Sequence, residues 1–224
     1  MRKLAFKPKS IRKKIYELHK ESKSPHIGCS LSCVEILMGI KKVMDVGDEF
    51  ILSKGHAISA WYAIHGVTDM CKLPKHATKG YYINFSTGSL GHGLSIACGW
   101  ALANRTKNIF IVMGDGECQE GQVWEALAFA AQHNLRNVRL IIDHNRLQAC
   151  GRPSDILGMT HLDRRINSFG WNVRTAYGHD VDEMVFLLRS LANPLKPTAI
   201  VACTTKGKGF IEMEDNNLYH YKSP

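Results

Sequence analysis

The chain has 224 residues, of which 45% are hydrophobic and 22% are charged, a composition typical of a soluble globular protein. Its longest apolar runs, such as residues 109–113, are too short to cross a bilayer. The lysines that follow Met1 do not form a secretory signal, so we expect a cytoplasmic protein without a membrane segment. The seven cysteines are scattered and form no C-x-x-C pair, which argues against a zinc site or a disulfide framework.

The formal net charge of +9 is concentrated near the N-terminus, where basic residues crowd the first 23 positions. A basic arm of this kind can bind nucleic acid or attract phosphorylated substrates. Ile11, Ile15 and Leu18, however, form an apolar stripe at helical spacing, so we interpret the lysines as the solvated face of a helix. Nucleic acid is not the partner we expect, because no stripe of mixed aromatic and basic residues is present.

The apolar pattern predicts an alternation of helices and short buried strands. The expected helices are, in chain order, residues 10–22, 32–44, 57–70, 90–105, 121–133 and 181–192. The expected strands are residues 108–113, 138–143, 172–176 and 198–204. This order is typical of a three-layer α/β/α fold with a mainly parallel sheet. No internal repeat or low-complexity linker interrupts the chain, so we expect residues 1–224 to form a single domain.

Polar residues follow two of the predicted strands, at the positions where ligands bind in open parallel sheets. A Gly-Asp-Gly turn around Asp115 comes after the strand at 108–113, and Asn145 comes after the strand at 138–143. A single crossover helix joins the two strands, so we expect their ends to lie side by side. The sequence therefore predicts that Asp115 and Asn145 are close together.

The residue types at these strand ends suit a divalent cation that also binds phosphates. Mg²⁺ prefers oxygen ligands and usually retains coordination positions for phosphate oxygens and water. Asp115 can supply a carboxylate, Asn145 an amide oxygen, and Leu147 a backbone carbonyl. Gly114 and Gly116 lack the side chains that would keep a phosphate away from the backbone. An isolated Gly-Asp-Gly is more often a simple turn, but its pairing with Asn145 favours a metal and diphosphate site.

The segment GDGECQEGQVWEALAFAAQHNLRNVRLIIDHNRLQACG resembles the thiamine-diphosphate motif of transketolases, in particular of split transketolases whose halves are separate polypeptides. Supporting stretches occur in the family's order: HIGCSLS at 26–32, DEFILSKGHA at 48–57, STGSLGHGLS at 86–95, FGWNV with GHD at 169–180, and TTKGKGFIEMEDNN near the end. The resemblance implies the fold of a diphosphate-binding (PP) domain. It also implies that the cofactors are thiamine diphosphate and Mg²⁺, for which Ca²⁺ or Mn²⁺ can substitute.

Carried over position by position, the resemblance implies a role for each motif residue. Asp115, Asn145 and the Leu147 carbonyl would hold the metal ion. The thiamine diphosphate would lie against residues from several motifs, namely His56, Gly88, Ser89, Leu90, Gly114, Gly116, Glu117, Asn145 and His220.

Three histidines and one glutamate have the catalytic roles that the resemblance implies. His56 would lie at the cofactor, and His26 and His220 beside the substrate and the reactive carbon. Glu120 would reach across a subunit interface to a second glutamate, which activates the cofactor's aminopyrimidine. Without the resemblance, these histidines would be ordinary core or loop residues, and Glu120 would simply complement the dipole of its helix.

The implied reaction is the transfer of a two-carbon ketol unit from a ketose, or ketose phosphate, to an aldose. The cofactor supplies the carbanion chemistry, and histidines suit the proton transfers because their pKa is near neutrality. The sequence stops at Pro224, without the pyrimidine-binding and C-terminal domains of the family. We therefore expect these on a separate partner chain, in an α₂β₂ assembly, without which this chain is inactive.

Some positions depart from the family pattern and leave the sugars open. The segment between Met70 and Ser86 is short and lacks the usual glycine-histidine-proline turn, whose histidine His76 would have to replace. Ile27 replaces a proline, and His92 replaces a glutamine. The alternatives are a subunit of a deoxyxylulose-phosphate-synthase-like or ketoacid-decarboxylating enzyme, and a non-catalytic binding subunit. The SKGH and STGSLG stretches favour transketolase over all of these.

Overall fold

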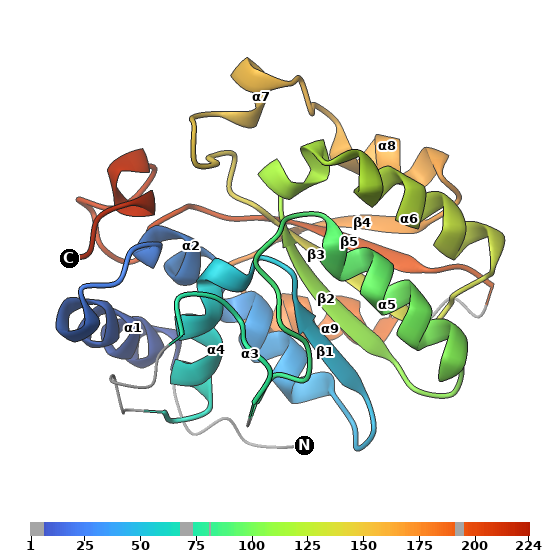
Figure 1. Ribbon diagram of the computed structural model, residues 1–224, viewed down its shortest axis with the longest axis horizontal. Helices are drawn as coiled ribbons and strands as arrows, with labels where there is room; N and C mark the ends of the chain where they lie inside the picture. Colours follow the sequence, from blue (N-terminus) through green and yellow to red (C-terminus); the bar gives the residue numbers. More distant parts are fainter. Residues whose placement is uncertain (1–6, 68–73, 81, 191–194) are drawn as a thin grey trace.

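A computed structural model describes residues 7–67, 74–80, 82–190 and 195–224 of the chain. Within these residues, parallel strands form one sheet in the order β1-β2-β3-β5-β4. The strands are β1 (Glu49–Leu52), β2 (Ile109–Gly114), β3 (Val138–His144), β4 (Asn172–Tyr177) and β5 (Thr198–Cys203). Helices cover both faces of this sheet (Figure 1), so the predicted three-layer α/β fold is confirmed.

Alternate residues of the strands point to opposite faces of the sheet and build two separate cores. On one face Phe110 and Val112 of β2 join the core formed with α1 (Pro8–Ser22), α2 (Ile27–Ser32), α3 (Val34–Val43), α4 (Ile58–Ile64) and α9 (Val181–Ser190). On the other face Ile109 and Ile111 join the core formed with α5 (His92–Ala103), α6 (Gly121–Gln132) and α8 (Leu162–Ser168). Burial on both faces explains why the strands are continuous apolar runs rather than alternating ones.

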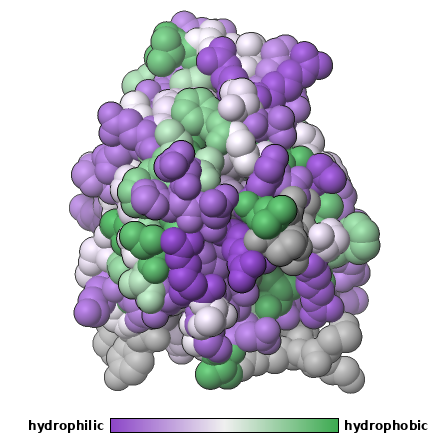
Figure 2. Space-filling model, turned by 90° about the vertical axis from the view of Figure 1, so that its right-hand side faces the viewer, coloured by the Kyte–Doolittle hydropathy of each residue, from purple (hydrophilic) through white to green (hydrophobic). Residues whose placement is uncertain are grey.

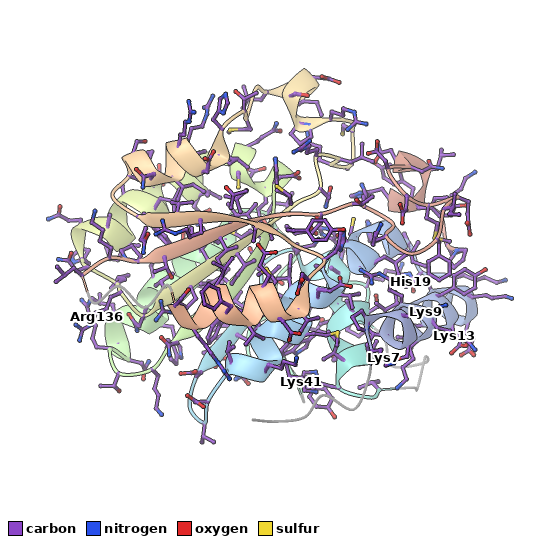
Figure 3. The ribbon with its side chains drawn as sticks, turned by 180° about the vertical axis from the view of Figure 1, so that it is seen from behind. Lys7, Lys9, Lys13, His19, Lys41 and Arg136 are labelled. Carbon is purple, nitrogen blue, oxygen red and sulfur yellow. The ribbon has the colours of Figure 1, made fainter. Side chains whose placement is uncertain are left out.

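The N-terminal helix α1 starts with a proline at its first turn and buries its predicted apolar stripe. Ile11, Ile15 and Leu18 are all in the core. Lys7, Lys9 and Lys13 are exposed and lie on the outer side of the helix (Figure 3). The lysines therefore form a solvent-facing surface of a helix that is held by its apolar side.

The predicted helices and strands are present, with differences at their ends. The helix expected at 57–70 ends at Ile64, while residues 68–70 lie outside the described part of the chain. The helix expected at 32–44 begins at Val34, because the separate short helix α2 precedes it. The short β1, the one-turn α7 (Pro153–Ile156) and α8 were not predicted, because their few residues give no clear apolar period.

The two ends of the sheet differ in what they present. Figure 2 shows the side of the molecule where the strands begin, and mostly hydrophilic residues with scattered hydrophobic ones cover it. At the opposite end, the loops after β2, β3 and β5 approach α2 and the C-terminal segment (Figure 1). Among the residues described, no helix has the length and apolar character needed to span a membrane.

Candidate active site

A cavity of about 370 Å³ opens at the carboxyl ends of β2 and β3. Most of the residues that the sequence assigns to the site line it: His26, His56, Gly88, Leu90, Gly114, Gly116, Glu117, Glu120, Asn145, Leu147 and His220. Ser89 and Asp115 are not among the lining residues. Ser89 is exposed, whereas the Asp115 side chain is buried directly beside the lining loop. The cavity therefore lies where the apolar strands end and the polar loops begin.

Asp115 follows β2 and Asn145 follows β3, and the two predicted metal-binding side chains lie close together where these strands end. The register places Gly114 opposite Asp143, so the residues that follow them come off the sheet side by side. Asp115 is 3% exposed, and its carboxylate accepts hydrogen bonds from the N–H groups of Gly116 (2.8 Å) and Arg146 (2.5 Å). The Asn145 Oδ1 accepts a hydrogen bond from the Leu147 N–H at 3.1 Å. Carboxylate and amide oxygens therefore meet around residues 145–147.

These donor atoms fit a hard divalent cation. Asp115, Asn145 and the Leu147 carbonyl offer only oxygen, which is the ligand type that Mg²⁺ and Ca²⁺ prefer. The Leu147 carbonyl accepts a hydrogen bond from the Lys206 ammonium at 2.9 Å, so this oxygen already faces a positive charge. Within the described residues, no cluster of three or more histidine, cysteine or acidic side chains could hold a metal. A cation here would need further oxygen ligands from a bound phosphate or water.

Lys206 is a site residue that the sequence analysis did not single out. Its side chain is fully buried, and its ammonium also contacts Asn217 Oδ1 (3.1 Å) and His220 Nδ1 (2.9 Å). Burial lowers the pKa of Lys206. The residue lies in the TTKGKG stretch, between Thr205 and Gly207. Lys206 therefore places its ammonium directly behind Leu147 and His220, two residues that line the cavity.

Four histidines from distant parts of the sequence surround the cavity. The ring centroid of His26 lies 4.9 Å from that of His220, 5.4 Å from that of His56 and 6.1 Å from that of His76. The backbone N–H of His26 also donates to the His220 carbonyl at 3.1 Å. The three histidines assigned from the sequence are therefore together, and His76 completes the group.

Burial is the main cause of the low pKa of His26, His56 and His220. Burial, followed by the neighbouring His76, lowers the pKa of His26 to about 4. Burial and then the Lys206 charge lower the pKa of His220 to about 3. Burial also holds the pKa of His56 well below its usual value. These rings are neutral at physiological pH, so each has one N–H donor and one nitrogen acceptor.

Two backbone hydrogen bonds fix the segment that carries His76. The Ala77 N–H donates to the Gly55 carbonyl (3.0 Å), and the Ala77 carbonyl accepts from the Thr87 N–H (2.8 Å). Ala77 therefore bridges the SKGH and STGSL stretches, and the ring of His76 lies against Gly88, where an added Cβ would be 3.4 Å away. The short segment before Ser86 thus still delivers a histidine to the cavity.

A family model described as "Transketolase, thiamine diphosphate binding domain" matches residues 41–221 of the chain. The chain belongs to this family. It is 35% identical to one of the subunits of apulose-4-phosphate transketolase from Actinobacillus succinogenes, over 99% of this chain and 91% of that protein. The corresponding subunit of Phocaeicola vulgatus is 31% identical, over 95% of this chain and 86% of its own length.

Longer transketolases match the chain over only part of their length. Human transketolase is 34% identical over 78% of this chain, a match that covers 31% of the human protein. The crystal structure of transketolase from Campylobacter jejuni superimposes with a TM-score of 0.86 at 25% identity, covering 96% of this chain and 40% of that one. The fold described here is therefore that of one portion of a full-length transketolase.

Within this transketolase-family cavity, Glu117 is held by the surrounding protein. Its carboxylate accepts hydrogen bonds from the Ser53 hydroxyl, the Gly91 N–H (2.9 Å) and the Gly114 N–H (3.3 Å). Burial raises its pKa, although these donors and Lys54 oppose the effect. Glu117 thus joins the ends of β1 and β2 to the turn before α5, and it shapes the cavity wall that it lines.

Glu120 has the opposite environment. It is exposed, lines the cavity, and occupies the N-cap position of α6 without a side-chain cap hydrogen bond. Gly91, with a φ of +86°, packs against it so closely that an added Cβ would lie 2.9 Å from the Glu120 Cβ. Gly91 therefore packs against the base of the Glu120 side chain, in a residue that is otherwise exposed.

The loop after β3 separates this cavity from a second one of about 330 Å³. Asn145 and Leu147 line the first cavity, whereas His144 and Arg146 line the second, with Arg152. Successive residues thus point to opposite sides of the loop. Residues 144–147 therefore contribute to the walls of both cavities.

Proposed function

We propose that this chain is the diphosphate-binding subunit of a split transketolase. The complete enzyme would transfer a two-carbon ketol unit from a ketose, or ketose phosphate, to an aldose. One observation carries the proposal: the oxygens of Asp115 and Asn145 converge beside a cavity ringed by histidines, in a chain that matches transketolase subunits over nearly its whole length. Apulose 4-phosphate, which the names of the relatives mention, is the first sugar phosphate to test.

The diphosphate of thiamine diphosphate and its Mg²⁺ would lie at the strand ends. Asp115, Asn145 and the Leu147 carbonyl would hold the metal, for which Ca²⁺ or Mn²⁺ could substitute. Gly114 and Gly116 line the cavity, and a Cβ on Gly116 would collide with the Gln148 side chain. When bound, the cofactor supplies the nucleophilic carbon that attacks a ketose carbonyl.

The histidines would hold and move protons at the sugar. The ammonium of Lys206 can only donate, so the His220 Nδ1 that it contacts is an acceptor, and the neutral ring has its proton on Nε2. His220 therefore offers a donor to a ligand oxygen. His26 and His56 are neutral for the reasons given above, and they can exchange protons with ketose hydroxyls. His76, at the cavity entrance, would contact the substrate.

A second polypeptide would complete the site. The relatives are named as subunits, which supports an assembly of two kinds of chain, and we propose an α₂β₂ arrangement. The exposed Glu120 would face the partner and reach its cofactor-activating glutamate. In this arrangement the partner contributes the pyrimidine-binding half, and the present chain alone does not turn over substrate.

The test is a ketol-transfer assay with thiamine diphosphate, Mg²⁺ and a ketose phosphate donor, with and without a co-expressed pyrimidine-binding chain. We expect turnover only with both chains, and its loss in Asp115→Asn and Asn145→Ala. Unchanged cofactor affinity in these two variants would refute the assignment of the site. Full turnover by this chain without a partner would refute the split arrangement.

A further inference from the structure

A buried carboxylate lies directly beneath the asparagine of the metal-binding loop. Asp143, the penultimate residue of β3, is 0% exposed. Its Oδ2 accepts hydrogen bonds from the Ser32 hydroxyl (2.5 Å) and the Lys54 ammonium, and its Oδ1 accepts one from the Thr204 hydroxyl. The Asn145 Nδ2 is the fourth donor, 3.3 Å from Oδ2. Asp143 thus joins α2, the loop after β1, the end of β5 and the metal-binding loop.

The partners of Asp143 show that it is a charged acceptor. Lys54 forms a buried ion pair with it, and the two hydroxyls donate to the same carboxylate. Lys54 is held on its other side by the Cys29 carbonyl at 3.1 Å. An ionised carboxylate has no hydrogen to donate and accepts on both oxygens. Any amide that contacts it must therefore present its NH₂ group.

This requirement acts together with the Leu147 N–H to set which way the Asn145 amide faces. The oxygen and nitrogen ends of an amide have nearly the same shape, so packing alone does not choose between them. With Nδ2 directed to Asp143, Oδ1 must face the other way, toward the Leu147 N–H at 3.1 Å and the cavity. A rotated amide would direct two N–H groups at any cation bound there.

We infer that Asp143 is a positioning residue, which makes Asn145 present its oxygen rather than its nitrogen to the divalent cation. This inference rests on the proposed function and deepens it. Asp143 does not touch the cation, and it acts through the hydrogen bond to Asn145. Lys54 makes a buried negative charge possible so close to the metal position, because an unpaired buried carboxylate would be strongly unfavourable.

The first test measures Mn²⁺ affinity by electron paramagnetic resonance, in the presence of thiamine diphosphate and in the complex with the partner subunit. We expect Asp143→Ala, which removes the acceptor that faces Asn145, to weaken Mn²⁺ binding by about 10- to 100-fold, as is typical when the partner of a metal ligand is lost. Thr204→Val is the matched control, because it removes one hydrogen bond to Asp143 but leaves the Asn145 contact in place. Its Mn²⁺ affinity should remain close to that of the wild type, and equal losses in both variants would overturn the inference.

The second test uses a charge swap, which a general loss of stability cannot imitate. Asn145→Asp adds a negative ligand charge, so simple electrostatics predicts tighter metal binding. We expect weaker binding instead, because two carboxylates would then face each other where Asn145 now donates to Asp143. The double variant Asp143→Asn/Asn145→Asp restores one donor and one acceptor, and it should bind Mn²⁺ more tightly than Asn145→Asp.

The outcomes separate the inference from the function on which it rests. If the wild-type complex binds neither Mn²⁺ nor thiamine diphosphate, the proposed function itself is wrong. If the wild type binds both, the inference is overturned when Asn145→Asp binds Mn²⁺ as tightly as the wild type, or when the swap gives no recovery over Asn145→Asp.

Discussion

The buried ammonium of Lys206 donates a hydrogen bond to Nδ1 of His220, across a distance of 2.9 Å. This contact fixes the tautomer of the imidazole and helps to keep it uncharged. The same ammonium contacts the Leu147 carbonyl. One lysine therefore connects the loop of residues 145–147 to His220, although neither contact could be read from the sequence.

Replacing Lys206 with methionine should raise the pKa of His220. Burial is the larger cause of its value of about 3, and the nearby Lys206 charge is the next, so removing the charge must shift the pKa upward. Nuclear magnetic resonance titration of histidine-labelled protein measures this shift. Lys208→Met is the control, because Lys208 pairs instead with Glu214 at 3.2 Å. A His220 pKa that is unchanged in Lys206→Met would contradict the proposed charge coupling.

The folded protein should lose stability as the pH falls below the ordinary histidine pKa of about 6.5. His26 and His220 have pKa values of about 4 and about 3 when folded, so the unfolded chain binds more protons between these values and 6.5. Protonation therefore favours unfolding throughout this range, and the full stability is present only above it. Urea unfolding at a series of pH values measures the effect. In the double variant His26→Gln/His220→Gln, the free energy of unfolding should fall less steeply with decreasing pH than in the wild type. Identical slopes in the two proteins would contradict this explanation.

His76→Ala should impair catalysis without impairing cofactor binding. His76 is exposed and lines the cavity, and its ring centroid lies 6.1 Å from that of His26. We expect kcat/KM for the donor sugar to fall by at least about 10-fold, a typical effect of losing one group that contacts the reacting substrate. The thiamine diphosphate affinity should stay constant. His133→Ala, an exposed histidine that follows α6, is the control, and a similar loss in both variants would argue against a role for His76.

Gly91→Ala should disturb both folding and the placement of Glu120. The positive φ of Gly91 costs any other residue about 1–3 kcal/mol, and the new Cβ would also press against Glu120. Gly66→Ala is a matched control, because Gly66 has a φ of +78° but no atom within 4 Å of an added Cβ. Urea unfolding should therefore show a lower free energy of unfolding in both variants, with the larger decrease in Gly91→Ala.

Association with the partner subunit provides the second measurement for this pair of variants. If Glu120 lies at the interface, sedimentation velocity should show weaker assembly for Gly91→Ala than for Gly66→Ala. Equal assembly by the two variants would indicate that Glu120 makes no contact with the partner.

The strand ends could be predicted from sequence because two long apolar runs identify β2 and β3, and parallel neighbours end at the same edge. That reasoning placed Asp115 and Asn145 correctly beside each other. The role of Lys206 could not be found in this way, because its burial arises only when the loop after β5 packs against residues 147 and 148. The four-residue β1 was missed for a similar reason, since its position in the sheet depends on pairing with β2.

Asp143 shows another limit of sequence reasoning. It lies in a predicted strand and has the ordinary appearance of a strand-ending aspartate. Its four donors come from parts of the chain as distant as Ser32 and Thr204. Sequence patterns identify residues that can contact a ligand. The buried groups that orient those residues can be identified only from the three-dimensional structure.

The hydrogen bond from the His26 N–H to the His220 carbonyl joins the C-terminal segment to the start of α2 (Figure 1). The C-terminal segment around His220 is therefore part of the cavity wall. Ligand binding in the cavity should stabilise the attachment of this segment, and the attached segment should in turn favour ligand binding. A bound ligand should protect the last turns from proteases and slow their amide exchange. Conversely, trimming the tail should release the ligand long before the central sheet loosens.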